Sequence, residues 1–108
     1  MDLRSRTAAV QSAKFHGLDK FPGICYIALL PDGSIKIGYS NTEELLEKRF
    51  KDLRRDYKAP VIPLATLKGG FVAEAVLHDK FKEHRLPGRG ERFAYSPEIA
   101  HYVAELRS

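Results

Sequence analysis

The first clear hydrophobic pattern in the chain consists of two strand-like runs of apolar residues, 23–30 and 34–40, separated by an Asp-Gly turn. An Asp-Gly pair between apolar runs is a strong hairpin signal. If the loop has two residues, Leu30 pairs with Ile35, and this register decides which side chains share a face. It predicts one face with Cys25, Ile27, Leu29, Lys36, Gly38 and Ser40, and another with Tyr26, Ala28, Ile35, Ile37 and Tyr39.

The next segment has helical spacing and clear end signals. Asn41 or Thr42 can cap the helix, and Pro60 lies just beyond its end. Acidic residues occupy the first turn and basic residues the last turns, which is the order that the helix dipole favours. We therefore expect one helix between the hairpin and Pro60.

The remaining segments predict one strand and two helices. Residues 61–67 are strand-like, and Pro63 places this strand at a sheet edge or a bulge because proline cannot donate to a ladder. A helix is expected from about 72 to 85, then a loop over 86–91, and Pro97 begins the last helix. The order ββαβαα predicts an α+β fold with a small three-stranded antiparallel sheet flanked by helices.

Composition excludes several classes of protein. The 108 residues are 44% hydrophobic and 30% charged, which is typical of a single globular domain and excludes wholesale disorder. No apolar run is long enough to span a membrane, and residues 1–22 lack the core of a signal peptide, so we expect a cytoplasmic protein without a membrane partner. Cys25 is the single cysteine, which excludes an internal disulfide and a cysteine-built zinc site.

Two charged residues fall on helix faces that are otherwise apolar. Arg49 lies within the arc formed by Leu45, Leu46, Phe50, Leu53 and Tyr57. On the later helix, Glu74 and His78 lie along the edge of the stripe formed by Ala73, Leu77 and Phe81. Their place on these faces predicts that both Arg49 and Glu74 point inward. Because an uncompensated buried charge is costly, each is expected to meet a partner there.

Two interpretations of these charges are open. Arg49 and Glu74 can form a structural ion pair between helices, or they can line a phosphate-binding cleft. A guanidinium donates two parallel hydrogen bonds to phosphate oxygens, and one carboxylate with waters can hold Mg²⁺. Lys36 adds a cation on the hairpin face that it shares with Gly38, where the absent side chain leaves room for a ligand.

Several short boxes resemble the GIY-YIG nuclease superfamily. They are Gly23-Ile24-Cys25-Tyr26-Ile27, Lys36-Ile37-Gly38-Tyr39-Ser40, Glu47-Lys48-Arg49-Phe50, Glu74 with Leu77-His78, and Gly90-Glu91-Arg92-Phe93. The KIG in place of YIG is similar to a compact branch found in phage and bacterial proteins. The resemblance covers residues 23 to about 106, so residues 23–108 are expected to form the nuclease-like domain and residues 1–22 an arm that is in part helical.

The resemblance implies an endonuclease that hydrolyses phosphodiester bonds in DNA with Mg²⁺ or Mn²⁺. By position, Arg49 resembles the family's catalytic arginine and Glu74 its metal ligand. For the proton acceptor three residues are open: Lys36, Tyr26 and His78. A lysine or tyrosine base needs a large pKa shift, whereas a histidine needs almost none. In the expected register, Tyr26 faces away from Lys36 unless a bulge intervenes.

The basic residues suggest where nucleic acid binds. Eighteen basic and fourteen acidic residues leave a net charge of +4, which permits binding of a polyanion. The candidates for contact with the DNA backbone are Lys48, Arg85, Arg89 and Arg92. RNA is not distinguished from DNA at this level. The alternatives to a nuclease are a nucleic-acid-binding module that has lost the chemistry and a small accessory protein.

Overall fold

The computed structural model describes residues 3–88 and 90–108, with the backbone alone for residues 3–6, 12, 14 and 15. The elements in chain order are α1 (Leu3–His16), η1 (Leu18–Lys20), β1 (Ile24–Leu29), β2 (Ile35–Ser40), α2 (Glu43–Tyr57), β3 (Ile62–Lys68), α3 (Gly70–Lys80), η2 (Lys82–His84), β4 (Arg92–Phe93) and α4 (Pro97–Arg107). No helix in this described part of the chain is long and apolar enough to cross a membrane.

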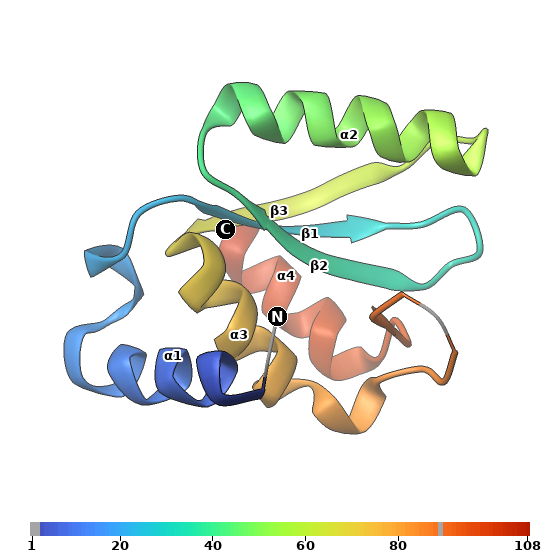
Figure 1. Cartoon of the computed structure of the whole chain (residues 1–108). Helices are drawn as coiled ribbons and strands as arrows, with labels where there is room; N and C mark the ends of the chain where they lie inside the picture. Colours follow the sequence, from blue (N-terminus) through green and yellow to red (C-terminus); the bar gives the residue numbers. More distant parts are fainter. Residues whose placement is uncertain (1–2, 89) are drawn as a thin grey trace.

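The architecture is α+β, with an antiparallel sheet in the order β3-β1-β2-β4. The expected sheet had three strands, and the structure adds a short fourth one. Two pairs, Ile35 with Phe93 and Lys36 with Arg92, join β4 to β2. A strand of two residues carries no alternating pattern, which is why the sequence predicted only a loop followed by a helix in this region. Helix α2 lies on one side of the sheet, and α1, α3 and α4 lie on the other (Figure 1).

The hairpin forms where the Asp-Gly turn predicted it, but its register differs by one residue. Leu29 pairs with Ile35, and the Leu30 N–H donates to the Ser34 carbonyl over 2.9 Å. The loop therefore has three residues, because Gly33 adopts the left-handed conformation with φ of 86° and adds a position to the turn. A shift of one residue exchanges the two sides of one strand relative to the other. The expected pairing of Leu30 with Ile35 is thus wrong.

The corrected register defines two faces of the sheet. The α3 face carries Cys25, Ile27, Ile35 and Ile37, which form the larger core with residues of α3, β4 and α4. The α2 face carries Tyr26, Ala28, Lys36 and Gly38, and its smaller core is completed by Leu30, Phe50, Leu53 and Val61. Tyr26 and Lys36 consequently share a face, contrary to the sequence-based expectation.

Helix α2 is capped by Thr42, whose Oγ1 accepts a hydrogen bond from the Leu45 N–H over 3.1 Å. Its buried residues are Phe50 and Leu53. Leu45 and Tyr57 were expected in the same apolar arc but are 47% and 42% exposed. The arc predicted from spacing is therefore wider than the surface that the sheet offers to this helix.

The later elements follow the sequence signals in part. Strand β3 is an edge strand, as Pro63 predicted, and its pairing with β1 shifts register between Ile27 and Ala28. Helix α3 ends at Lys80 and not near 85, since Phe81 leaves the helical conformation and the chain turns into η2. Helix α4 is capped by Ser96, whose Oγ accepts from the Ile99 N–H over 3.2 Å.

The segment before β1 crosses the start of α3 at a contact between two backbones. A Cβ added to Gly70 would overlap the Pro22 carbonyl oxygen and approach the Gly23 Cα to 3.0 Å. Gly23 and Gly70 both have positive φ, of 94° and 48°. Beyond this crossing, α1 packs against α3, and Ala9 of α1 is buried there. The glycines thus allow α3 to begin directly beside the strand β1.

Candidate functional site

The ring of Tyr26 lies across Gly38, its cross-strand partner on the α2 face. A Cβ on Gly38 would overlap the hydroxyl oxygen and Cζ of Tyr26. The ring also packs against Phe50 of α2, with centroids 5.2 Å apart, and the residue is 1% exposed. The expectation that Gly38 leaves room for a ligand is therefore wrong, because the space holds the Tyr26 ring.

Arg49 reaches this tyrosine from α2. Its guanidinium donates a hydrogen bond to the Tyr26 hydroxyl, while the residue as a whole stays exposed. The sequence predicted an arginine that points inward to a partner: the partner is the buried Tyr26, but Arg49 itself is exposed and not buried. Helix α2 covers only part of its face, so a long side chain can reach a buried ring and keep contact with water.

Glu74 approaches the same place from the other side of the sheet. Helix α3 runs along the outer edge of β2, because Phe71 packs against Tyr39 at 5.7 Å between ring centroids and His78 bonds to the Ile37 carbonyl. Glu74 lies between these two contacts on the helix and is 8% exposed. The prediction that Glu74 points inward is confirmed. Its charge acts on both Tyr26 and Lys36.

Lys36 completes a group of four side chains that we name the edge cluster: Tyr26, Lys36, Arg49 and Glu74. Lys36 is half-buried, and burial lowers its pKa from 10.5, as does the charge of Arg49, while Glu74 and Glu91 act in the opposite direction. Burial raises the pKa of Tyr26 against the hydrogen bond from Arg49. The edge cluster therefore makes the charged form of both Lys36 and Tyr26 less favourable than it is in water.

His78 forms a hydrogen bond to the backbone of β2. Its Nε2 donates to the Ile37 carbonyl over 3.0 Å, and its Nδ1 lies 3.5 Å from the Glu91 carboxylate. Strand β4 pairs with β2 only at Ile35 and Lys36, so Ile37 lies just past the end of that ladder. His78 thus supplies a hydrogen bond where the neighbouring strand has ended, which is the work of a residue that fixes α3 against β2.

The basic residues predicted to bind nucleic acid lie in different surroundings. Lys48 is exposed on α2, next to Arg49. Arg92 contacts Asp32 over 2.6 Å, and Arg85 lies 3.6 Å from Glu91. Arg89 falls outside the described residues. Of the three described residues, Lys48 and not the two paired arginines is therefore the stronger candidate for phosphate.

Glu91 is a neighbour that sequence reasoning did not assign. It acts on Lys36 and contacts both His78 and Arg85. Its place depends on β4, which brings residues 91–93 back to the start of β2. A two-residue strand has no periodicity, so the sequence pattern did not place Glu91 near the edge cluster, although the box Gly90-Glu91-Arg92-Phe93 is part of the resemblance.

The donor set at the edge cluster fits one mode of metal binding. Among the described residues, no group of three or more acidic, histidine or cysteine side chains could enclose a metal ion. Mg²⁺ rarely needs such a cage, since one or two carboxylates together with water and substrate phosphates commonly hold it. Glu74 alone fits this second mode, which requires a bound phosphodiester to complete the site.

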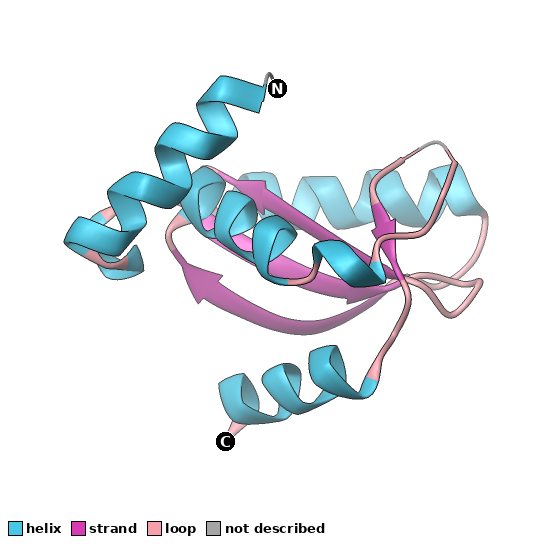
Figure 2. Cartoon of the chain, turned by 90° about the horizontal axis from the view of Figure 1, so that it is seen from below, coloured by secondary structure: helices cyan, strands magenta, loops and turns pink. Residues whose placement is uncertain are grey.

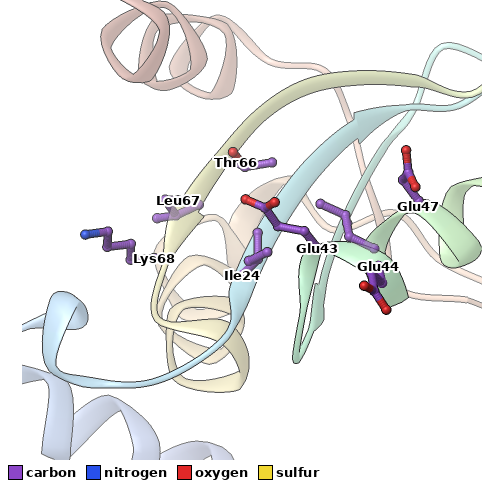
Figure 3. Close-up of a pocket in the computed structure, with 8 residues that line it drawn as sticks. Ile24, Glu43, Glu44, Glu47, Thr66, Leu67 and Lys68 are labelled. Carbon is purple, nitrogen blue, oxygen red and sulfur yellow. The ribbon is translucent and has the colours of Figure 1, made fainter.

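A separate open pocket of about 680 Å³ lies on the α2 face between the first turns of α2 and the ends of β1 and β3 (Figure 3). Its lining is Ile24, Glu43, Glu44, Leu46, Glu47, Thr66, Leu67 and Lys68. Three carboxylates against one ammonium group make it unsuitable for phosphate. The edge cluster and this pocket therefore have opposite electrostatic preferences.

Comparisons with known proteins give no relative for the chain. No protein-family model matches it, and neither a curated protein nor a solved structure matches it with significant similarity. Function is therefore inferred from the chemistry of the edge cluster and from the sequence motifs that supply its residues.

Proposed function

We propose that this protein is a metal-dependent endonuclease that hydrolyses phosphodiester bonds in DNA. One observation carries the proposal: Arg49 and Glu74, from helices on opposite sides of the sheet, both act electrostatically on Tyr26 and on Lys36. A cation, a carboxylate, a hydroxyl and an amine with a lowered pKa are the groups that phosphodiester hydrolysis uses.

The arrangement of elements supports the resemblance to GIY-YIG nucleases. The hairpin β1-β2, helix α2, strand β3 and helix α3 follow each other within one antiparallel sheet, in the order that the sequence motifs require. Each motif contributes one member of the edge cluster: Tyr26 from the first, Lys36 from the second, Arg49 from α2 and Glu74 from α3. Four motifs that are distant in sequence therefore contribute to one site.

In the proposed reaction, Arg49 binds the phosphate. Its guanidinium stays in contact with solvent, so a DNA backbone can reach it, and two parallel N–H groups match two phosphate oxygens. Glu74 would hold Mg²⁺ or Mn²⁺, which when bound neutralises charge that develops on the phosphate. The Tyr26 hydroxyl accepts a hydrogen bond from Arg49 and so helps to hold the guanidinium in place.

Lys36 is the proposed proton acceptor. Its pKa is lowered by burial first and by Arg49 second, so a larger fraction of the amine is neutral than in water. Tyr26 has a raised pKa and keeps its proton. His78 holds the backbone of β2 through Nε2 and is assigned the role of positioning α3, and with it Glu74.

One observation favours a second candidate, a DNA-binding module without catalysis. The described residues offer no group of three metal ligands, and a single carboxylate whose charge acts on Lys36 can serve as an electrostatic partner only. In that case Arg49 and Lys36 bind DNA and Glu74 has a structural role.

The experiment that separates these candidates is a plasmid-nicking assay with Mg²⁺ or Mn²⁺. We expect Arg49→Ala and Glu74→Gln each to reduce nicking by about 10²- to 10³-fold, as removal of a group that stabilises the transition state does. Matched controls are Arg55→Ala, an exposed arginine of α2 that contacts Asp52 and Asp56, and Glu83→Gln, an exposed glutamate of η2. Both should keep the wild-type rate.

The nuclease and the DNA-binding module predict different effects of Glu74→Gln. DNA binding without any nicking, unchanged in Glu74→Gln, would support the binding module and overturn the nuclease. Thermal unfolding of each variant shows whether a lost activity comes from a lost fold. Nicking that disappears in both site variants, but in neither control, supports the enzyme.

A further inference from the structure

Tyr39 and Phe71 form an aromatic pair that is open to solvent at the end of β2. Tyr39 is 40% exposed, Phe71 is half-buried, and their rings meet edge to face at 5.7 Å and 67°. Tyr39 lies on the α3 side of the sheet, where α3 runs between α1 and α4 (Figure 2). Neither residue belongs to the edge cluster.

The pair lies one step along the β2 edge from the edge cluster. Tyr39 directly follows Gly38, which the Tyr26 ring covers, and successive strand residues are about 3.3 Å apart. Phe71 precedes Glu74 by three residues on α3, a rise of about 4.5 Å. The aromatic pair therefore lies one turn from Glu74 on the α3 side of β2, across the sheet edge from Lys36 and Arg49 on the α2 side; past Lys36 this edge pairs with no further strand among the described residues.

We propose that Tyr39, supported by Phe71, stacks with an unpaired base of the DNA strand whose phosphate contacts Arg49. The inference rests on the proposed function for the identity of the phosphate site. An aromatic ring beside a cationic patch is how proteins hold single-stranded nucleic acid, since each base has a face that can stack. In a duplex these faces are hidden, so the substrate class is DNA with an unpaired segment at the site of cleavage.

Charge complementarity selects this occupant. Arg49 and Lys48 are exposed cations of α2, on the other side of the β2 edge from the pair. A nucleotide offers a phosphate to these cations and a flat apolar base to the rings. An apolar peptide would gain nothing from the cations, and the acidic pocket lies elsewhere on α2 and β3.

The test measures binding of a single-stranded oligonucleotide with one 2-aminopurine, in EDTA so that metal-dependent hydrolysis does not occur. Wild type should quench the 2-aminopurine fluorescence and bind the single strand more tightly than the matching duplex. Tyr39→Ala and Tyr39→Leu should lose about 5- to 100-fold in single-strand affinity with little change for duplex, and Tyr39→Phe should restore it. Tyr39→Leu keeps an apolar contact with Phe71 without an aromatic face.

Tyr95→Ala is the matched control, because Tyr95 is also 42% exposed but follows β4. It should bind as wild type does. An equal loss in Tyr95→Ala, or unchanged single-strand affinity in both Tyr39→Ala and Tyr39→Leu, would overturn the inference, as would a wild type that does not bind single strands.

The inference and the proposed function fail in different ways. A wild type that quenches through Tyr39 but does not nick any DNA when Mg²⁺ or Mn²⁺ is added would overturn the nuclease and leave the stacking site. A wild type that nicks DNA at the same rate as Tyr39→Ala on single-stranded and duplex substrates would overturn the stacking site and leave the nuclease.

Discussion

The two faces of the sheet differ in how fully helices cover them. On the α3 face, α3 and α4 bury a continuous apolar core that includes Phe81, Phe93 and Ile99, each 0% exposed. On the α2 face, a single helix covers a smaller core, and polar side chains lie beside it. We infer that the α3 face supplies most of the stability. The α2 face can therefore hold charged groups close to apolar ones.

The largest effects are expected when one aromatic side chain is removed from each face, which tests directly whether the α3 face is the more stabilising one. Phe81→Ala should cost near the upper end of about 3–5 kcal/mol in the free energy of unfolding, because its cavity is enclosed on all sides. Phe50→Ala should cost near the lower end, since Phe50 is 5% exposed and water or Arg54 can enter its site. Urea denaturation monitored by circular dichroism measures both. An equal or larger loss in Phe50→Ala would contradict the proposed difference between faces.

The packing of Tyr26 over Gly38 gives the next largest effect. Gly38→Ala should destabilise the protein by about 1–3 kcal/mol, because the added methyl group overlaps the ring. A double-mutant cycle with Tyr26→Ala sharpens the test: once the ring is absent, Gly38→Ala should cost much less. Additive free energies of unfolding would show that the ring does not occupy this space in solution.

Much of the fold could be predicted from the sequence, because local chemistry determines it. The Asp-Gly turn, the cap at Thr42, Pro63 at an edge and Pro97 at the start of the last helix each depend on neighbouring residues. The register was wrong because Gly33 joined the loop, and the two-residue strand β4 was missed because it has no pattern of its own. Local signals fixed where elements begin, but not how many residues a turn uses.

The sequence predicted which residues belong to the candidate site better than it predicted how they are arranged. Periodicity singled out Arg49 and Glu74, and in the structure the charges of both act on Tyr26 and Lys36. The sequence could not show that Arg49 stays exposed, because this depends on how little of the sheet α2 covers. It also could not show that His78 bonds to Ile37, since that bond exists only where β4 ends.

Two cations that differ in their partners allow a finer test of the α2 face. Lys48→Ala should reduce the salt dependence of DNA binding by about one phosphate contact, a slope change near 0.9. Arg92→Ala should change it less, because Arg92 already contacts Asp32 over 2.6 Å. Fluorescence anisotropy at several salt concentrations gives both slopes. A larger change in Arg92→Ala would place DNA near β4 and not along α2.

The smallest expected effect concerns Lys36 and pH. Its folded-state pKa lies below the ordinary value of 10.5, so between these two values the unfolded state binds more protons and stability rises with pH. Lys36→Met should remove this rise. Unfolding in urea as the pH rises towards 10.5 measures it as the difference between the two proteins, because Tyr26, whose pKa is raised from 10.0, acts in the opposite sense in both. Identical slopes for both proteins would show that Lys36 is solvated.

The backbone crossing at Gly23 and Gly70 has a consequence for how the site can vary. The distance between α3 and β1 at this point is set by two main chains with no side chain between them. A single methyl group at Gly70 would wedge them apart and tilt the whole helix, carrying the Glu74 carboxylate away from the strand edge. The position of the Glu74 carboxylate thus depends on Gly70, a residue without a side chain that lies four positions earlier and outside every motif.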